Sequence, residues 1–294
     1  MMHDNEYVVD ARLVRRLVAR QFPQWADLPL RAVESTGTNN AIYRLGDDMV
    51  VRLPRIAAAV EQVRFEYEWL PRLAAVVPAA IPEPIALGTP DEAYPCPWAI
   101  NRWVEGVHPT ENDGGDQRFA QSLGEFIAVL RDFDATGARQ GYRTGPLHTR
   151  DTYVREWVAK AEGLIDAKAV LAVWQDALDL PQWSGPPRWT HGDLLPGNVL
   201  VQDGRLTAVI DFGAAGVGDP ACDALPAWTL LTAETRPTFR AAAGFDDATW
   251  ARGRAWALTF VGGITYYRRT NPAMADLGRR AIAEVLQDLA SEVG

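Results

Sequence analysis

The stretch from Thr190 to Asp223 constrains the fold of this chain more than any other part of its sequence. It holds two short, largely apolar runs, Val199–Val201 and Leu206–Ile210, separated by the dipeptide Asp203-Gly204. An Asp-Gly pair between two such runs is a strong signal for a β-hairpin, because glycine adopts a positive φ without steric cost. The sequence therefore predicts a tight hairpin here.

Polar side chains stand at both ends of the expected hairpin. Asn198 directly precedes it, Asp211 directly follows it, and Asp193 lies five residues before Asn198. A tight hairpin would bring its two ends together, so one amide and two carboxylates are expected to share a small volume. Oxygen ligands of this kind suit Mg²⁺, which often shares them with a phosphate.

The composition is that of an ordinary globular protein, with 294 residues, 48% hydrophobic and 23% charged. This length is enough for two domains. The formal net charge of −9 disfavours nucleic acid as a partner, because phosphate neutralisation needs clustered Lys and Arg. The same charge is compatible with a cationic ligand, although an acidic balance is also a common means of remaining soluble.

Cysteine usage and hydropathy point to a cytoplasmic protein with no membrane partner. The two cysteines, Cys96 and Cys222, lie far apart and indicate neither a disulfide framework nor a zinc site. The N-terminus lacks the plan of a signal peptide, and no apolar run is long enough to cross a bilayer. Nothing in the sequence distinguishes a monomer from a dimer.

The hydrophobic pattern divides the chain into a sheet-forming part and a helical part. After an amphipathic helix at Val9–Phe22, alternating residues predict a meander of three antiparallel strands, then a helix that Pro71 bends or ends early. The strands expected in this first part are Leu30–Val33, Ala41–Leu45, Met49–Leu53, Ile85–Gly88 and Trp98–Ile100.

Beyond the polar, glycine-rich segment that begins at Gly106, apolar residues recur mostly at helical spacing. The expected helical zones are Phe119–Phe133, Tyr153–Leu178, Ala224–Leu231, Asp247–Arg269 and Met274–Val293. We therefore predict an α+β chain with a first domain at 1–103, a hinge at about 100–106 and a second domain at 104–294.

Three motifs follow one another in the second domain. Taken alone, the first could be a plain turn, and the second is a tripeptide that arises by chance, because Asp and Gly are common in turns. Together, in this order, they resemble the catalytic core of the protein-kinase-like superfamily. Within it they are similar to the aminoglycoside phosphotransferase family of small-molecule kinases. The motifs are His191-Gly-Asp193-x-x-x-x-Asn198, Asp211-Phe212-Gly213 and Gly218-Asp219-Pro220-x-x-Asp223. The resemblance implies a two-lobed kinase-like fold, with a small antiparallel-sheet N-lobe and a mainly helical C-lobe.

The resemblance also implies a role for each matching residue of the second domain. Asp193 would accept or orient the proton of the attacking hydroxyl, and Asn198 and Asp211 would hold Mg²⁺ against the nucleotide phosphates. His191 would brace the loop rather than react. Phosphoryl transfer needs mainly positioning and charge neutralisation, which an acid, an amide and a metal supply.

In the first domain, the resemblance implies a grip on the nucleotide phosphates. The turn formed by Ser35, Thr36, Gly37 and Thr38 would cover the phosphates, although without context it is an ordinary hairpin turn. Arg52 stands where the family has a lysine, and this domain has no lysine. Glu66 would align Arg52. The alternatives are that Arg52 is a strand-surface charge of a weakly active protein and that Glu66 is an exposed helical residue.

The base of the nucleotide would be read at the hinge by the Arg102 carbonyl and the Val104 amide. Backbone groups do not choose between purines, so the sequence leaves two nucleotide donors open. ATP is the expected donor and GTP is the alternative.

The resemblance implies that the acceptor binds to the helical domain. Residues 104–294 carry a net charge of −7, against −2 for residues 1–103, which suits an amine-bearing acceptor. Aromatic residues at Trp228, Trp250, Trp256, Tyr266 and Tyr267 could line an apolar pocket, or they could belong to the core. Acidic residues at Glu234, Asp246 and Asp247 lie near helix ends, where carboxylates commonly act as caps.

Three functions remain open at this point. The first is phosphate transfer from a nucleoside triphosphate to a hydroxyl of an aminoglycoside-type antibiotic, which would confer resistance. The second is the same reaction on another alcohol, such as a macrolide, a peptide antibiotic, homoserine or an amino alcohol. The third is a nucleotide-binding protein that is catalytically idle or regulatory.

Overall fold

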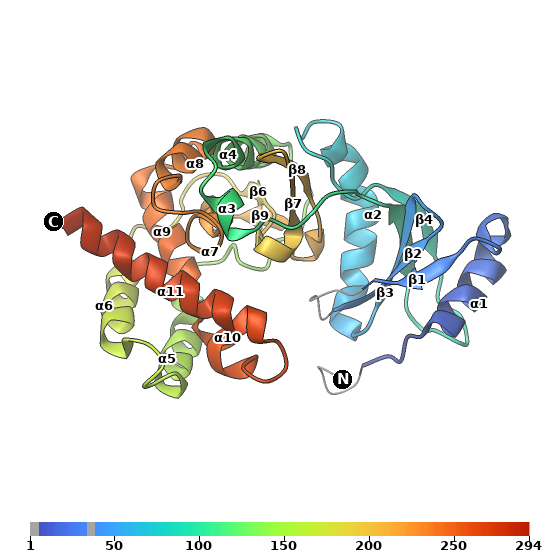
Figure 1. Cartoon of the computed structure of the whole chain (residues 1–294), viewed down its shortest axis with the longest axis horizontal. Coiled ribbons are helices and arrows are strands. Elements are labelled where there is room, and N and C mark those ends of the chain that lie inside the picture. Colours follow the sequence, from blue (N-terminus) through green and yellow to red (C-terminus); the bar gives the residue numbers. More distant parts are fainter. Residues whose placement is uncertain (1–5, 34–38, 294) are drawn as a thin grey trace. The chain divides into compact units, whose positions relative to one another are not determined.

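The computed structural model describes residues 6–33 and 39–293. Their contacts divide the chain into two compact units (Figure 1). The first, called the sheet unit here, comprises residues 1–106 together with 208–213, and the second, the helical unit, comprises 107–207 together with 214–294. The segment that carries Asp211 thus groups with the sheet unit, whereas the residues before and after it in sequence group with the helical unit.

The sheet unit contains a five-stranded antiparallel sheet with the strand order β1-β2-β3-β5-β4. In the ladder, Tyr43 of β2 pairs with Val51 of β3, which in turn pairs with Ile100 of β5. The predicted meander of three consecutive strands is therefore confirmed. The strands are β1 (Leu30–Ala32), β2 (Asn40–Leu45), β3 (Met49–Pro54), β4 (Pro84–Gly88) and β5 (Trp98–Arg102).

Figure 1 shows helices α1 (Ala11–Gln21) and α2 (Val60–Ala74) on opposite sides of this sheet. Side chains alternate between the two faces of a strand, and on β3 the residues Met49, Val51 and Leu53 join the buried core together with α1. Val50 and Arg52 consequently point to the other face. Helix α2 runs past Pro71, so the expected early end at that proline is wrong.

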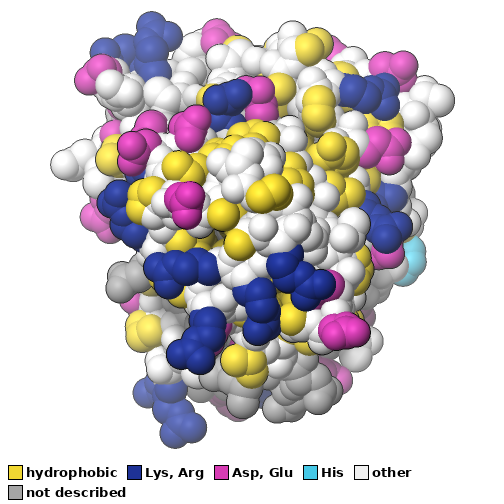
Figure 2. Space-filling view, turned by 90° about the vertical axis from the view of Figure 1, so that its right-hand side faces the viewer, with side chains coloured by type: hydrophobic (Ala, Val, Ile, Leu, Met, Phe, Trp, Pro, Cys, Tyr) yellow, Lys and Arg dark blue, Asp and Glu magenta, His cyan; other side chains and the backbone are white. Residues whose placement is uncertain are grey.

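Helix α1 is amphipathic, as expected. Its buried residues are Leu13, Val14, Leu17 and Val18, and its four arginines are exposed. Figure 2 looks at the side of the molecule on which α1 lies in Figure 1, and basic side chains gather in the lower half of that face. Within the described residues, no helix has the length and apolar character needed to span a membrane.

The helical unit is built mainly from α-helices, with two short antiparallel strand pairs, although the last two residues of one strand, Ala208 and Val209, group with the sheet unit. Two of the long helical zones expected from sequence are each split in two. The first breaks at Gly163, whose φ of +79° leaves the helical region as glycine allows. The helices are α3 (Glu111–Gly114), α4 (Gln117–Asp132), α5 (Asp151–Lys160), α6 (Ala167–Leu178), α7 (Pro226–Thr229), α8 (Arg236–Ala243), α9 (Asp247–Leu258), α10 (Val261–Tyr266) and α11 (Pro272–Val293).

One strand pair joins β6 (Arg188–Thr190) to β9 (Gly216–Gly218), and the other joins β7 (Val199–Gln202) to β8 (Arg205–Val209). The second pair is the predicted hairpin, which is confirmed. Its two turn residues, Asp203 and Gly204, have φ of 51° and 70°. Positive φ at both positions is the geometry of the tight two-residue turn whose twist matches that of the strands.

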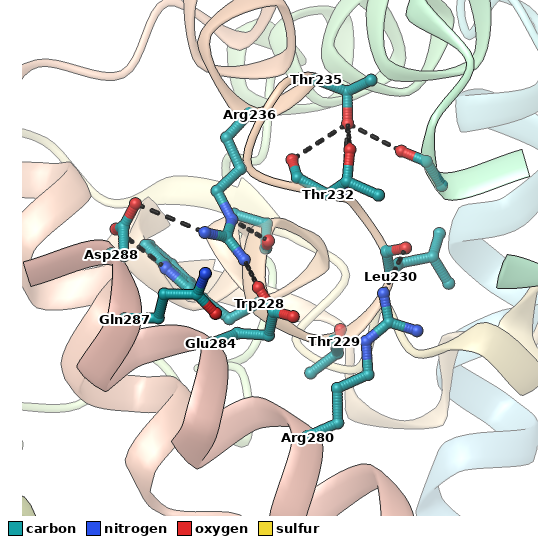
Figure 3. A network of polar contacts seen from close by, with 12 residues as sticks. Trp228, Thr229, Leu230, Thr232, Thr235, Arg236, Arg280, Glu284, Gln287 and Asp288 are labelled. Carbon is teal, nitrogen blue, oxygen red and sulfur yellow. Dashed lines mark hydrogen bonds and ion pairs between the residues drawn. The ribbon is translucent and has the colours of Figure 1, made fainter. Parts of the chain in front are cut away.

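A buried arginine anchors the C-terminal helix α11. Figure 3 shows Arg236, the first residue of α8, pointing toward Glu284 and Asp288 of α11. Its Nε donates to the Ala227 carbonyl at 2.6 Å, and only 3% of its surface is exposed. Asp288 also accepts from the Trp228 indole at 3.1 Å. The network therefore ties α7, α8 and α11 together.

We expect Arg236→Gln to destabilise the protein by about 3 kcal/mol, because it removes a buried charge that pairs with Glu284 and Asp288, and only Asp288 keeps another cationic partner, Arg254. The matched control is Arg240→Gln on the same helix, whose partner Asp247 is fully exposed; an exposed pair contributes about 1 kcal/mol or less. Urea unfolding followed by circular dichroism measures both. Equal losses of stability for the two variants would contradict this role for Arg236.

Candidate active site

A buried carboxylate fixes the backbone of the loop from His191 to Asn198. Asp223 accepts hydrogen bonds from the backbone amides of His191 and Gly192, each at 2.8 Å. Burial raises the pKa of Asp223. Gly192 has φ of +74°, and a Cβ there would lie 3.0 Å from the Ala214 carbonyl oxygen, so only glycine fits. The motif that ends at Asp223 therefore shapes the loop that begins at His191.

His191 itself is fully buried. Its Nδ1 accepts the backbone N–H of Asp193 at 3.2 Å, which is the bracing contact expected from sequence. The other acid of the tail motif, Asp219, forms a two-pronged ion pair with buried Arg252, at 2.7 and 3.1 Å. These contacts make the loop a rigid support for Asp193.

Both carboxylate oxygens of Asp193 are directed by neighbours. Arg143 Nη1 donates to Oδ1 at 2.6 Å, and Asn198 Nδ2 donates to Oδ2 at 3.1 Å. Asn198 also bonds the Asp193 carbonyl at 2.8 Å. The Asp193 side chain stays 27% exposed, so a ligand can still reach it. The structure thus presents one oriented, accessible carboxylate.

Arg143 is a site residue that the sequence motifs missed. It lies in the loop between α4 and α5, fifty residues before its partner Asp193, and also donates to the Gly192 carbonyl at 2.8 Å. Burial alone would lower the pKa of Arg143, but the Asp193 carboxylate outweighs burial and raises it. The sequence feature that could have pointed to Arg143 is its place in a short loop bounded by Gly141 and Gly145.

The sheet unit holds a second charged cluster around Arg52. Its Nη1 donates to Glu66 Oε2 at 2.6 Å, and its Nη2 donates to Asp211 Oδ1 at 3.0 Å. Glu66 comes from α2 and is buried, so the alternative of an exposed helical glutamate is wrong. Burial would lower the pKa of Arg52, yet the two carboxylates raise it.

The planar guanidinium explains how an arginine can occupy position 52, where the family has a lysine. Two different nitrogens of Arg52 reach two different carboxylates, whereas a lysine presents one ammonium group. The cluster formed by Arg52, Glu66 and Asp211 carries one positive and two negative charges. Phosphate binding beside this net negative charge would require a further cation.

The predicted metal ligands have the chemistry that Mg²⁺ needs. The side chain of Asp211 is 41% exposed, and its φ of +62° lies in the left-handed region that non-glycine residues rarely adopt outside special sites. Asn198 uses its amide nitrogen for Asp193, which leaves its amide oxygen to act as a ligand. Carboxylate and amide oxygens are suitable ligands for this hard cation.

The remaining predicted positions lie in the sheet unit. Ser35, Thr36, Gly37 and Thr38 fall outside the described residues.

At the expected hinge, the Arg102 amide donates to the Glu83 carbonyl at 2.8 Å, and the Trp103 amide donates to the Asp48 carbonyl at 2.7 Å. Neither bond engages the Arg102 carbonyl or the Val104 amide, the two groups expected to read the base.

Asn101, beside this hinge, is another residue that sequence reasoning missed. It is 1% exposed, and neither of its amide atoms has a hydrogen-bond partner among the described residues. Such atoms cost about 1–3 kcal/mol each when left unsatisfied. Asn101 pairs with Val50 and Ala99 pairs with Arg52, so the alternation of strands places Asn101 and Arg52 on the same face of the sheet.

Comparison with known proteins now adds to this geometry. Residues 29–256 match the model of the phosphotransferase enzyme family, APH. The chain belongs to this family. The uncharacterized protein YcbJ of Bacillus subtilis (strain 168) is 28% identical over an alignment of 249 positions, and the match covers 76% of each chain. The family predicted from the His191, Asp211 and Asp219 motifs is therefore confirmed.

Solved structures agree on the fold of this APH-family phosphotransferase. The GDP complex of aminoglycoside 2'-phosphotransferase-IIIa matches 96% of this chain and 100% of its own, with a TM-score of 0.75 and 21% identity. The apoenzyme of macrolide 2'-phosphotransferase MphH from Brachybacterium faecium matches 93% and 98%, with a TM-score of 0.62 and 27% identity. The predicted kinase-like α+β class is confirmed.

We expect Arg143→Met to lower the kcat of phosphate transfer while leaving the nucleotide KM nearly unchanged, because Arg143 orients Asp193, the residue expected to act on the acceptor hydroxyl. Loss of orientation of about 1 Å can cost on the order of 100-fold in rate. The control is Arg155→Met, a half-exposed arginine on α5. Steady-state kinetics of both variants is the measurement, and partial recovery in Arg143→Lys would support positioning. An Arg143→Met variant with the wild-type kcat would refute it.

Proposed function

We propose that this phosphotransferase moves the terminal phosphate of ATP, with GTP as the alternative donor, to a hydroxyl group of a small molecule in a Mg²⁺-dependent reaction. The observation that carries this proposal is the oriented Asp193 carboxylate, held by Arg143 and Asn198 in a loop that Asp223 fixes. Family membership supplies the reaction class. The intact site also argues against a catalytically idle or regulatory protein.

In this mechanism Asp193 accepts a hydrogen bond from the attacking hydroxyl and aims its oxygen at the phosphate. Little covalent chemistry falls to the protein, because phosphoryl transfer depends mainly on positioning and on charge neutralisation. Asn198 and Asp211 are the proposed ligands of Mg²⁺, which when bound would neutralise charge on the phosphates.

We assign nucleotide binding to residues 1–103. Arg52 would contact the phosphates while Glu66 keeps it in place, and the turn Ser35, Thr36, Gly37 and Thr38 would cover them. The Arg102 carbonyl and the Val104 amide would bind the base. Structures of related fold were solved with GDP or ADP, which supports a nucleotide donor.

We assign acceptor binding to residues 104–294, and an antibiotic-type alcohol is the proposed acceptor. Related structures include a complex with GDP and kanamycin and another with gentamicin, which supports an aminoglycoside-type compound. A macrolide is the second candidate, because two of the matching structures are macrolide 2'-phosphotransferases.

Replacement of Asp193 tests the proposed reaction. We expect Asp193→Asn to lower kcat by about 10²- to 10⁴-fold, the usual contribution of a positioned acid or base, with little change in Mg-nucleotide affinity. The wild-type enzyme is first screened with ATP or GTP against a panel of alcohols, and the added phosphate is detected by mass. The control is Asp176→Asn, an exposed residue of α6. An unchanged transfer rate in Asp193→Asn would rule out the mechanism.

Replacement of Arg52 tests the phosphate grip. We expect Arg52→Met to raise the nucleotide Kd at least about 10-fold, since a charge-assisted hydrogen bond contributes about 1.5–3 kcal/mol. Arg52→Lys should recover only part of the affinity. It restores the positive charge, but one ammonium group cannot hold both Glu66 and Asp211 as the guanidinium does. Exposed Arg31 on β1 offers the control Arg31→Met. Nucleotide titration by calorimetry provides the readout, and equal affinities in wild type and Arg52→Met would exclude the role.

A further inference from the structure

Arg252 of α9 is a buried arginine, 4% exposed, whose guanidinium is bonded to three other residues. Its Nε and Nη2 donate to the two carboxylate oxygens of Asp219 at 2.7 and 3.1 Å. Its Nη1 donates to the Pro181 carbonyl at 3.1 Å, and Nη2 also reaches the Thr249 hydroxyl at 3.3 Å. A two-pronged pair of this kind fixes the direction of the carboxylate as well as its charge. Arg252 therefore holds the Asp219 side chain in one orientation.

The backbone of Asp219 is bonded in turn to the loop that carries Arg143. The Asp219 amide donates to the Thr144 carbonyl at 3.2 Å, directly after Arg143 in the chain. On the other side of Arg143, the Tyr142 amide donates to the Ala214 carbonyl at 3.0 Å. Both neighbours of Arg143 are thus tied to one segment, residues 214–219.

A cavity of about 240 Å³ lies beside segment 214–219, and its lining includes Thr144, Gly218, Asp219 and Arg252. The wall of a cavity has no protein atoms packed against its open side, so the Arg252 ion pair is the main restraint on Asp219 from this direction. The segment and the loop themselves are in close contact, because a Cβ at Gly218 would lie 2.4 Å from the Thr144 Cβ. A displacement of Asp219 would therefore also displace the loop.

We infer that Arg252 is a positioning residue for Asp193. It fixes the Asp219 side chain, and Asp219 holds the loop at Thr144. That loop places Arg143 so that its Nη1 reaches Asp193 Oδ1 at 2.6 Å. Within residues 6–33 and 39–293 no hydrogen bond joins Arg252 directly to Asp193, so its effect is indirect. The inference rests on the proposed function and adds a residue that governs the alignment of its carboxylate.

Two arginines of α9 provide a matched test, because Arg252 and Arg254 are both buried and each pairs with a carboxylate. We expect Arg252→Met to lower the kcat of phosphate transfer about 10- to 100-fold, the range that a displacement of up to about 1 Å can cost, with the nucleotide KM nearly unchanged. Arg252→Lys keeps the buried charge but not the two-pronged bond, so it should fold well and lose less activity. Arg254→Met should lower stability in urea unfolding and leave kcat nearly unchanged.

A double replacement identifies the route by which Arg252 acts. Effects of residues in one network are not additive, so Arg252→Met should cost little further kcat in the Arg143→Met background. Asp219 Oδ1 also accepts the Ala221 amide at 3.0 Å, in the turn that leads to Asp223. A full additional loss of kcat in the double variant would assign the effect to that turn and overturn the inference.

Hydrogen exchange measured by mass spectrometry gives a readout that needs no acceptor. The amides of Gly141 and Tyr142 donate to carbonyls of segment 214–219 at 3.1 and 3.0 Å, and we expect their exchange to be faster in Arg252→Met but not in Arg254→Met. Unchanged exchange or unchanged kcat in Arg252→Met, or equal effects of the two replacements, overturns the inference. Faster exchange in Arg252→Met, with no phosphate transfer by the wild type to any alcohol, supports the link from Arg252 to the loop and refutes the proposed function.

Discussion

The buried carboxylate of Asp223 is the interaction on which the rest of the site depends. It accepts two backbone N–H groups from His191 and Gly192, at a place where no strand or helix could satisfy them. An unmade bond to a buried amide costs about 1–3 kcal/mol, so the loop is held in one conformation. The conformation of the loop backbone therefore sets the direction in which the Asp193 side chain points. Hydrogen bonds from Arg143 and Asn198 then orient its carboxylate.

Both units rely on arginine where related chemistry could use lysine. The whole chain has two lysines, Lys160 and Lys168. Arg52 reaches two carboxylates with two nitrogens, and Arg252 binds both oxygens of Asp219. A fork with fixed geometry orients its partners as well as neutralising them. In this protein the arginines therefore act as parts of the framework that holds the acids.

Much of this could be read from the sequence, because the relevant signals are local. The Asp203-Gly204 turn predicted the hairpin, and the meander followed from alternation around Arg52. Contacts between distant residues left no such signal. Nothing in a periodic pattern links Arg143 to Asp193, fifty residues later, or groups residues 208–213 with the sheet unit.

The expected apolar pocket also shows that sequence patterns do not report contacts between distant residues. Trp228, Trp250 and Trp256 are buried, as the core alternative held, yet Trp256 also forms part of a cavity wall. Helical spacing reports that a side chain turns inward. It does not report whether that side chain packs in the core or lines a cavity, because this depends on which loop packs against it.

Three arginines of the chain differ in how many acids they face, and this difference indicates how the charge of each is compensated. Arg52 faces two carboxylates, so its cluster is negative and suits a metal cation beside phosphates. Arg143 faces one, so the pair is neutral and serves to orient Asp193. Arg150 faces none within the described chain and is only partly buried, so water can solvate its charge. Arg52 and Arg143, whose side chains are 11% and 19% exposed, depend instead on carboxylates for compensation.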